Sequence, residues 1–357
     1  MDFALSEQQV LLQSTINEFL QAHAPLAKVR ELVADDKSSD AALTEGLAEI
    51  GVPGVLIPEE FGGVGLTHLD AALIAESLGA TVAPYSFIGS AVIAVSAILQ
   101  SSDEDLKQTW LPKIAEGSTQ VAIAISDHTG QRDSTGVSYE KGSLQGETMF
   151  ALDVENANAV LVADKDQSTY LADLNEVEVI VLKSIDKTRS LAELRFHQSP
   201  AILVTRDREQ LAQIIALGRV MLAADTLGAA QTMLDKAIEY AGERKQFNRV
   251  IGSFQAVKHL CAEMAADLEP CRSLVWYAAH SFHSIPDEAR LVANHAKAHL
   301  AEVGQSVARK ATEVHGGMGF TDLLGLHYWF KRIGLNRQLL GSPNSIRKEI
   351  AKQQGWT

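Results

Sequence analysis

The period of the hydrophobic pattern changes twice along this 357-residue chain, and this change constrains the fold more than any other feature. From Ser6 to about Gly117, apolar residues recur every three or four positions, as in QQVLLQSTINEFLQAH, which is typical of amphipathic helices. From about Thr119 to Thr205 the period is two, in short runs such as VAIAIS and VEVIVLK. From about Arg208 the helical period returns, so we expect a helical unit, a β unit and a second helical unit.

These transitions predict an α+β multidomain chain divided at residues 1–118, 119–207 and 208–357. The middle unit has several short strands without long helices between them, which predicts a compact antiparallel barrel or sandwich. Long helical patterns then follow near 209–245, 253–283, 286–313 and 322–338, and they predict a helical bundle.

The charge and the cysteines restrict the class of protein. The formal net charge of −14 argues against nucleic-acid binding and against an anionic membrane surface. A polyanionic cofactor could bind only where local Arg, Lys or helix N-termini reverse this field. Cys261 and Cys271 have no spacing typical of a metal site or a disulfide framework. Because the chain has neither a signal-peptide pattern nor a run of about 18 apolar residues, we expect a soluble cytoplasmic protein.

A group of cations interrupts the first long helical pattern of the bundle. In YAGERKQFNRVIGSFQAVKH, a short break holds Arg244, Lys245, Phe247 and Arg249, and Ser253 is expected to cap the next helix. Cations beside a free helix N-terminus form an anion-binding arrangement. A solvated turn between two helices explains the same residues, so this stretch alone leaves both interpretations open.

A second candidate lies in ATEVHGGMGFTD, where a helical pattern ends at His315 and Gly316, Gly317 and Gly319 follow. Glycines permit a backbone to approach a ligand closely, or they simply turn the chain after a helix. His315 has no partner at metal-ligand spacing, which favours a packing or capping role. By itself the stretch favours a turn over a binding loop, and we expect no metal.

Four stretches, taken in order, resemble the acyl-CoA dehydrogenase family of flavoproteins. They are PEEFGGVGL (58–66), LKQTWLPKIAEG (106–117), ERKQF with FQAVKHLCAEM (243–264), and HGGMGF (315–320). The resemblance spans nearly the whole chain. It implies an N-terminal helical domain, a middle β-barrel domain and a C-terminal four-helix bundle. It also implies FAD-dependent α,β-dehydrogenation of an acyl-CoA thioester, with an electron-transfer flavoprotein or a similar electron acceptor.

In this family a carboxylate base removes the α-proton of the acyl group while the β-hydrogen leaves as hydride to the flavin. The backbone N–H of the base residue helps to hold the thioester oxygen. Carried over by position, Arg244, Phe247 and Gln255 would meet the FAD of a neighbouring subunit, and Gly316 and Gly317 would let the backbone approach its diphosphate. The site then needs at least a dimer, and the family is usually a dimer of dimers.

The usual positions of the catalytic base hold no ionisable group in this chain. One position, just before the Gly-Ser of QLLGSPNS, is Leu340, and a leucine cannot accept a proton. The other, directly before Arg219 on the first bundle helix, is Gly218. Because Arg219 matches an arginine near the family's substrate site, the resemblance places Arg219 and Leu340 beside the substrate.

The middle domain departs from the family pattern at two flavin-facing stretches. Thr-Glu-Pro is replaced by Ser-Asp-His at 126–128, where Ser126 can still donate a hydrogen bond. Trp-Ile-Thr or Trp-Ile-Ser is replaced by Phe-Ala-Leu at 150–152, where Leu152 cannot donate. Near the adenosine diphosphate the usual Gln is Glu313, and a carboxylate ~4 Å from a phosphate costs about 4 kcal/mol at an effective dielectric near 20, unless a cation offsets it.

These departures favour a subunit similar to the base-lacking partner in heteromeric acyl-CoA dehydrogenases that act on steroid-CoA side chains. A second, related subunit would supply the carboxylate, and the two would complete a shared FAD site in a heterotetramer. One alternative is a homo-oligomeric dehydrogenase with a displaced base, for which Glu313 and Asp322 are candidates. The other is a non-catalytic scaffold subunit that binds acyl-CoA or flavin.

Overall fold

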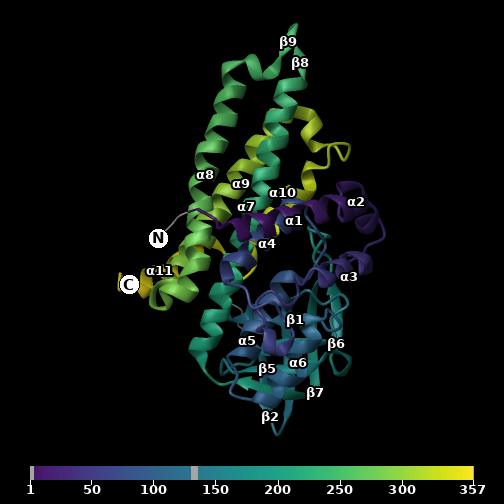
Figure 1. Cartoon of the computed structure of the whole chain (residues 1–357), viewed down its shortest axis with the longest axis vertical. Coiled ribbons are helices and arrows are strands. Elements are labelled where there is room, and N and C mark those ends of the chain that lie inside the picture. Colours follow the sequence, from purple (N-terminus) through teal and green to yellow (C-terminus); the bar gives the residue numbers. More distant parts are fainter. Residues whose placement is uncertain (1–3, 130–135, 357) are drawn as a thin grey trace.

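The computed structural model describes residues 4–129 and 136–356 of the chain. Figure 1 shows the β-sheet at one end of the molecule and the long helices of the bundle extending away from it, with the N-terminal helices beside both. Helix α4 packs along α7, and the segment η2 contacts both α7 and strand β1. The N-terminal helices therefore connect the sheet to the bundle.

The N-terminal domain begins with a helix whose start the sequence predicts. Ser6 caps α1: its Oγ accepts a hydrogen bond from the Gln9 N–H at 3.2 Å, and the Gln9 side chain accepts from the Ser6 N–H at 3.0 Å. The elements are α1 (Glu7–His23), α2 (Leu26–Ala34), α3 (Ala41–Glu49), η1 (Glu59–Phe61), α4 (His68–Ala80), η2 (Phe87–Ala94), α5 (Val95–Leu99) and α6 (Glu104–Ala115). Of these, η2 has the wider winding of a π-helix and is buried throughout.

The middle domain is one seven-stranded sheet in the order β2-β3-β1-β4-β5-β7-β6, with a further pairing of β3 and β7 that closes it into a barrel. The elements are β1 (Val121–Ala124), η3 (Ser126–His128), β2 (Gly136–Glu140), β3 (Ser143–Leu152), β4 (Ala159–Ala163), β5 (Thr169–Asp173), η4 (Leu174–Glu176), β6 (Glu178–Leu182) and β7 (Leu191–Thr205). Strands β1 and β4 run parallel, so the expectation of a purely antiparallel domain is wrong. The β2–β3 hairpin lies between them in sequence and provides the long crossover that a parallel pair requires.

The C-terminal domain is a bundle around the long helix α7. Its elements are α7 (Arg208–Glu243), β8 (Lys245–Gln246), β9 (Arg249–Val250), η5 (Ile251–Ser253), α8 (Gln255–Ser284), α9 (Pro286–His315), η6 (Gly316–Phe320), α10 (Leu326–Gln338) and α11 (Pro343–Gln353). Glycines let α7 approach α4 closely. A Cβ on Gly79 would lie 2.0 Å from the Asp225 carbonyl oxygen, and one on Gly228 would lie 1.8 Å from the Glu76 carbonyl oxygen.

Helix α7 is long and apolar enough to cross a membrane by length and composition, yet 89% of its apolar stretch is buried inside the protein. It is therefore the central core helix of the bundle. Two charged side chains on it, Arg219 and Asp225, are buried and hydrogen-bonded, and both prove important below.

The expected cap at Ser253 is wrong. The N-cap of α8 is Phe254, and the Ser253 Oγ instead donates to the Val250 carbonyl at 2.7 Å. A short hairpin, β8–β9, precedes α8, and its turn residues Phe247 and Asn248 both have positive φ, at 53° and 64°. Two consecutive positive φ values are typical of a type I′ turn, which Asn favours but Phe does not, so the sequence signal was weak.

Candidate active site

A cavity of about 840 Å³ lies between the middle domain and the turn that joins α10 to α11. Its β-domain wall contains residues 126–129, Phe150 and Leu191. Its bundle wall contains Arg219 and many of the residues between Leu335 and Glu349. Residues distant in the sequence therefore converge on one space at the junction of two domains, which is a common setting for a ligand site.

Gly218 and Leu340, the usual base positions, meet at this junction. A Cβ on Gly218 would lie 2.6 Å from Leu340 Cδ1 and 2.7 Å from Ile93 Cδ1. Leu340 is 5% exposed and Ile93 is fully buried. The leucine side chain thus fills the space above the glycine, and the pair offers an apolar contact where the family pattern has a carboxylate.

The backbone at Leu340 is unusual. Its φ of +55° lies in the left-handed region, which a residue other than glycine enters at a cost of about 1 kcal/mol or more. Its carbonyl accepts a hydrogen bond from Arg219 Nε at 2.8 Å. No residue in the described part of the chain accepts a hydrogen bond from its N–H. The N–H that the resemblance assigns to the thioester oxygen is therefore not used within the described residues.

Arg219 is a buried cation at the cavity wall, with 3% of its surface exposed. Besides the Leu340 carbonyl, it binds Asn294 Oδ1 at 2.6 Å and Glu349 Oε2 at 2.9 Å, both through Nη1. Burial lowers the pKa of Arg219 from its ordinary value, and the Glu349 carboxylate opposes this shift. Glu349 itself lines the cavity, so the guanidinium joins the turn at Leu340 to the main acidic group of the bundle wall.

The β-domain wall offers few hydrogen-bond donors to a flavin. Ser126 Oγ donates to the Phe150 carbonyl at 3.0 Å, so this hydroxyl already uses its proton to join the two flavin-facing stretches. Leu152 is 4% exposed and pairs with Leu191 and Ile123 inside the sheet. Of residues 150–152 only Phe150 reaches the cavity.

The residues predicted for the adenosine diphosphate half lie at the opposite end of the bundle, around the β8–β9 hairpin (Figure 1). Arg244 and Gln255 are exposed, and Phe247 is 86% exposed. Phe254 supports the hairpin: the Arg249 guanidinium lies 3.9 Å from the centre of its ring, and Phe247 meets the ring edge to face. The hairpin thus presents a cation and an aromatic ring to the outside of this chain.

The Gly316–Gly317 turn lies close to the same end of α7. Tyr240, one turn before Arg244, stacks on His315 with ring centroids 4.5 Å apart, and Gly316 follows directly. Gly316 has a φ of +58°, which favours glycine, whereas Gly317 has an ordinary φ. Nothing in the described chain lies within 4 Å of a Cβ built on either residue. The open space at Gly317 fits a ligand or subunit that approaches from outside.

These two groups of residues are too far apart to bind one dinucleotide within a single chain. Gly218 and Arg244 are 26 positions apart along α7 and its C-cap, which corresponds to ~39 Å at 1.5 Å per residue. An extended FAD does not span this distance. The cavity and the hairpin of one chain therefore cannot both contact one FAD molecule.

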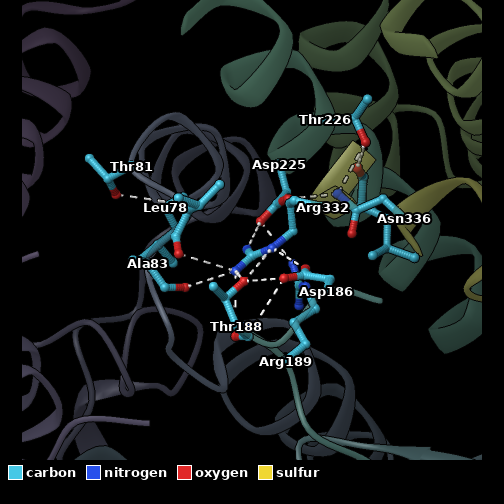
Figure 2. Close-up of polar contacts among 12 residues, drawn as sticks. Leu78, Thr81, Ala83, Asp186, Thr188, Arg189, Asp225, Thr226, Arg332 and Asn336 are labelled. Carbon is cyan, nitrogen blue, oxygen red and sulfur yellow. Dashed lines mark hydrogen bonds and ion pairs between the residues drawn. The ribbon is translucent and has the colours of Figure 1, made fainter. Parts of the chain in front are cut away.

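Figure 2 shows a buried cluster of charges that the sequence did not predict. Arg332 binds Asp186 Oδ2 at 2.8 Å and Asp225 Oδ2 at 3.1 Å, and Arg189 binds the same Asp225 oxygen at 2.8 Å. Arg332 also donates to the Ala83 carbonyl at 3.2 Å and to Thr188 Oγ1. This cluster joins all three domains, and Arg189 and Arg332 lie close in sequence to the cavity residues Leu191 and Leu335.

The candidate displaced bases lie elsewhere. Glu313 and Asp322 are exposed, and neither lines the cavity. Asp322 faces His327, with Oδ1 3.5 Å from Nε2. Glu349, which sequence reasoning missed, is the bundle carboxylate at the cavity, but it lies in a polar terminal helix whose pattern gives no sign of it. Among residues 4–129 and 136–356, no cluster of His, Cys, Asp and Glu is arranged to hold a metal ion.

Comparison with known proteins matches the whole architecture. The family model described as acyl-CoA dehydrogenase, N-terminal domain, matches residues 6–118, and that described as acyl-CoA dehydrogenase, C-terminal domain, matches residues 209–355. Acyl-CoA dehydrogenase IpdE2 of Mycobacterium tuberculosis is 29% identical over 350 residues, which cover 97% of each chain. The mitochondrial short/branched chain specific acyl-CoA dehydrogenase of Bos taurus is 26% identical, over 97% of this chain and 85% of that protein.

Solved structures agree on the fold. The ChsE4-ChsE5 complex from Mycobacterium tuberculosis contains a chain that superposes with a TM-score of 0.90 at 24% identity, and each chain is covered completely. This likeness shows the arrangement of helical domain, β domain and bundle. Since the two family models match both helical parts of the chain and the fold agrees throughout, this chain belongs to the acyl-CoA dehydrogenase family.

Proposed function

We propose that this chain is one subunit of a hetero-oligomeric, FAD-dependent acyl-CoA dehydrogenase whose partner subunit supplies the catalytic carboxylate. One observation carries the proposal: both usual base positions, Leu340 and Gly218, meet beside the cavity, and neither side chain can take a proton. The similarity of the fold to a chain of the ChsE4-ChsE5 complex supports a heteromeric arrangement, and the similarity to IpdE2 supports acyl-CoA dehydrogenation. Electrons would pass on to an electron-transfer flavoprotein or a similar acceptor, in the cytoplasm.

The residues of this chain fit the two halves of FAD unequally. Arg244, Phe247 and the open turn at Gly316 and Gly317 are exposed together and suit a dinucleotide diphosphate that approaches from outside. In the cavity, the Ser126 hydroxyl already donates within the protein. When bound, FAD supplies the acceptor for hydride. The contribution of this chain is then to hold the adenosine diphosphate half of a cofactor whose flavin lies against the partner.

A homo-oligomeric dehydrogenase with a displaced base is the second candidate, and Glu349 is the observation that favours it. Its carboxylate lines the cavity on the same wall as Leu340. This carboxylate is already paired with Arg219, whose Nη1 lies 2.9 Å from Glu349 Oε2. Because of this contact, Glu349 acts mainly as the counterion of Arg219. We therefore rank the homo-oligomeric candidate below the heteromer.

The visible flavin spectrum separates these functions. The chain would be purified alone and after co-expression with a related acyl-CoA dehydrogenase subunit from the same source, then mixed with octanoyl-CoA or a steroid side-chain CoA thioester. The heteromer predicts flavin and substrate bleaching only in the co-expressed complex. Stoichiometric flavin that bleaches in the isolated chain contradicts it, and loss of that bleaching in Glu349→Gln would then identify the base.

A substitution in the hairpin tests the contribution of this chain to the cofactor. Arg244→Met removes an exposed cation, so we expect a change in the free energy of unfolding within about 0.5 kcal/mol. The flavin content of the co-expressed complex should fall, because a diphosphate contact is lost. Lys258→Met, on the adjacent exposed part of α8, is the matched control and should leave the flavin content unchanged. Equal flavin content in both variants would contradict the assignment of Arg244.

A further inference from the structure

The turn between α10 and α11 holds Leu340 in a conformation that leucine does not favour. Its φ of +55° needs compensation from the surroundings. Within the turn, the Gly341 N–H donates to the Gln338 carbonyl at 3.2 Å, and the Leu339 N–H closes α10 on Leu335 at 3.1 Å. The Gly341 N–H and the Leu340 carbonyl belong to one peptide group, so the bond to Gln338 holds this group from one side only and leaves the carbonyl free for a second contact.

Arg219 contacts Leu340 from outside the turn. Its Nε donates to the Leu340 carbonyl at 2.8 Å, and its Nη1 is anchored by Asn294 at 2.6 Å and Glu349 at 2.9 Å. Asn294 is fully buried on α9, so one anchor belongs to the rigid core of the bundle. The planar guanidinium can serve the turn and both anchors at once because its donors point in fixed directions.

The cavity side of the same residue is coupled to this contact through the backbone torsions of Leu340. The Leu340 side chain packs over Gly218 and Ile93, and its N–H, in the preceding peptide group, has no acceptor in residues 4–129 and 136–356. Without Arg219, only the Gly341 N–H would hold the peptide group after Leu340, and the φ and ψ of Leu340 could relax towards the more favourable right-handed or extended regions, which would move the side chain and the N–H relative to each other. The position of the cavity wall is thus coupled to one hydrogen bond from α7.

We propose that Arg219 is a positioning residue that holds the Leu340 peptide in its left-handed conformation, so that the N–H and side chain of residue 340 face the cavity. Glu349 and Asn294 orient the guanidinium, and Leu340 is the group that it positions. The functional part of this inference rests on the proposed function, because an acyl-CoA thioester is the ligand that this wall would face. The structural claim itself can be tested without a cofactor.

Hydrogen–deuterium exchange of the isolated chain measures how firmly the turn at Leu340 is held. The reporters are the amides of Leu339 and Gly341, which are hydrogen-bonded within the turn. In Arg219→Met, exchange at these amides should accelerate by about tenfold or more, because the turn loses the contact that fixes it. The matched control is Arg290→Met, which removes a partly exposed arginine bound to Glu209 between the same two helices, α7 and α9. It should leave the turn within about twofold of the wild type.

Two further variants separate positioning from general stabilisation. Glu349→Ala removes the anchor on α11, so exchange should accelerate over 343–353, whereas Leu339 and Gly341 should stay protected because Asn294 still anchors Arg219. Arg219→Lys retains the charge but has a single ammonium, which cannot serve both the carbonyl and the anchors, so protection of the turn should not return. If Arg219→Met fails to fold, Arg219→Lys alone tests whether Arg219 holds the turn. Full protection in Arg219→Lys, or equal exposure of the turn in Glu349→Ala and Arg219→Met, would overturn the proposal.

Because no flavin or partner enters this experiment, its outcome is independent of the flavin spectrum. An unchanged turn in Arg219→Met rejects the positioning role even if the complex proves to be a dehydrogenase. Conversely, a loosened turn in a chain that never supports flavin bleaching retains the positioning role and rejects the proposed function.

Discussion

The buried charge cluster and the Gly218–Leu340 contact lie at the same junction of β domain and bundle, but they use opposite chemistry. The cluster places Arg332, Asp186 and Asp225 in the core, each at most 2% exposed, and pairs every charge (Figure 2). The contact beside the cavity has no ionisable group, although the family pattern places a carboxylate there. The charged side chains of the cluster thus join the domains, whereas the Gly218–Leu340 contact beside the cavity is apolar.

The absence of a carboxylate at positions 218 and 340 is not accompanied by poor packing of the junction. A buried guanidinium is tolerated only if its hydrogen bonds are made, because an unpaired buried charge costs several kcal/mol. Arg332 meets this requirement with partners from all three domains. Leu340 and Gly218 likewise fit each other closely. The junction is therefore well packed on both sides.

The largest effect is expected from the cluster. Arg332→Met leaves Asp186 and Asp225 buried with fewer partners, so the free energy of unfolding should fall by about 3–5 kcal/mol. Denaturant unfolding checks this value. The control on the same helix is Arg337→Met, which breaks a partly exposed pair with Glu302 at 2.9 Å and should cost about 1 kcal/mol or less. Similar losses of unfolding free energy in the two variants would contradict the special role of the cluster, because it would then behave like a surface ion pair.

A smaller, pH-dependent effect is expected from Lys297, a buried lysine without a carboxylate partner among residues 4–129 and 136–356. Its Nζ donates to the Asn336 carbonyl at 2.7 Å, and burial, with Arg219 and Arg337 nearby, lowers its pKa to about 7. Between about pH 7 and 10.5 the unfolded chain binds a proton that the folded chain does not. The stability of the wild type relative to Lys297→Met should therefore rise with pH across this window, by roughly 2–4 kcal/mol.

Unfolding of both proteins at several pH values between 6 and 10.5 measures the difference. The titration of other lysines and tyrosines cancels in the comparison of the two proteins. A difference that stays constant with pH, or falls, would show that Lys297 is charged and solvated in the folded chain.

The smallest effect is expected from the apolar contact, and its size should depend on the partner. Gly218→Ala introduces a Cβ 2.6 Å from Leu340 Cδ1 and 2.7 Å from Ile93 Cδ1, and this overpacking should destabilise the wild type by about 1 kcal/mol. In a Leu340→Ala background only the contact with Ile93 remains, so the same change should cost less, and the helix preference of alanine, about 1 kcal/mol, offsets part of that cost. A double-mutant cycle by denaturant unfolding gives the coupling. Simple additivity would mean that the two residues do not pack together.

The sequence predicted the order of the domains because hydrophobic period is a local property. The start of α1 at Ser6 and the long bundle helices follow from patterns within each segment. The turn at the cavity could also be found, because the resemblance directed attention to Leu340 and Gly218 and the structure brings them together. The hairpin at 245–250 was missed, since its turn uses Phe247 at a position where glycine or asparagine is the usual signal.

The charge cluster and the position of Glu349 at the cavity could not be predicted from the sequence, for a different reason. Asp225 is a charged residue in an apolar, Ala-rich helix, which signals a buried partner but not which one. Its partners Arg189, in the middle domain, and Arg332, on α10 of the same bundle, lie 36 and 107 positions away. The parallel pairing of β1 with β4 has the same origin, because strand period does not specify which strands become neighbours.

By itself the sequence determined the three-part architecture, the absence of an ionisable side chain at the two usual base positions and the acidic charge that disfavours nucleic acid. Only the tertiary structure decided that Leu340 covers Gly218, that Arg219 links this turn to Glu349, and that the hairpin lies at the far end of the bundle from the cavity. Local patterns follow from the chemistry of neighbouring residues in the chain. The contacts of a site depend on how whole helices and sheets pack, which joins residues that no local pattern relates.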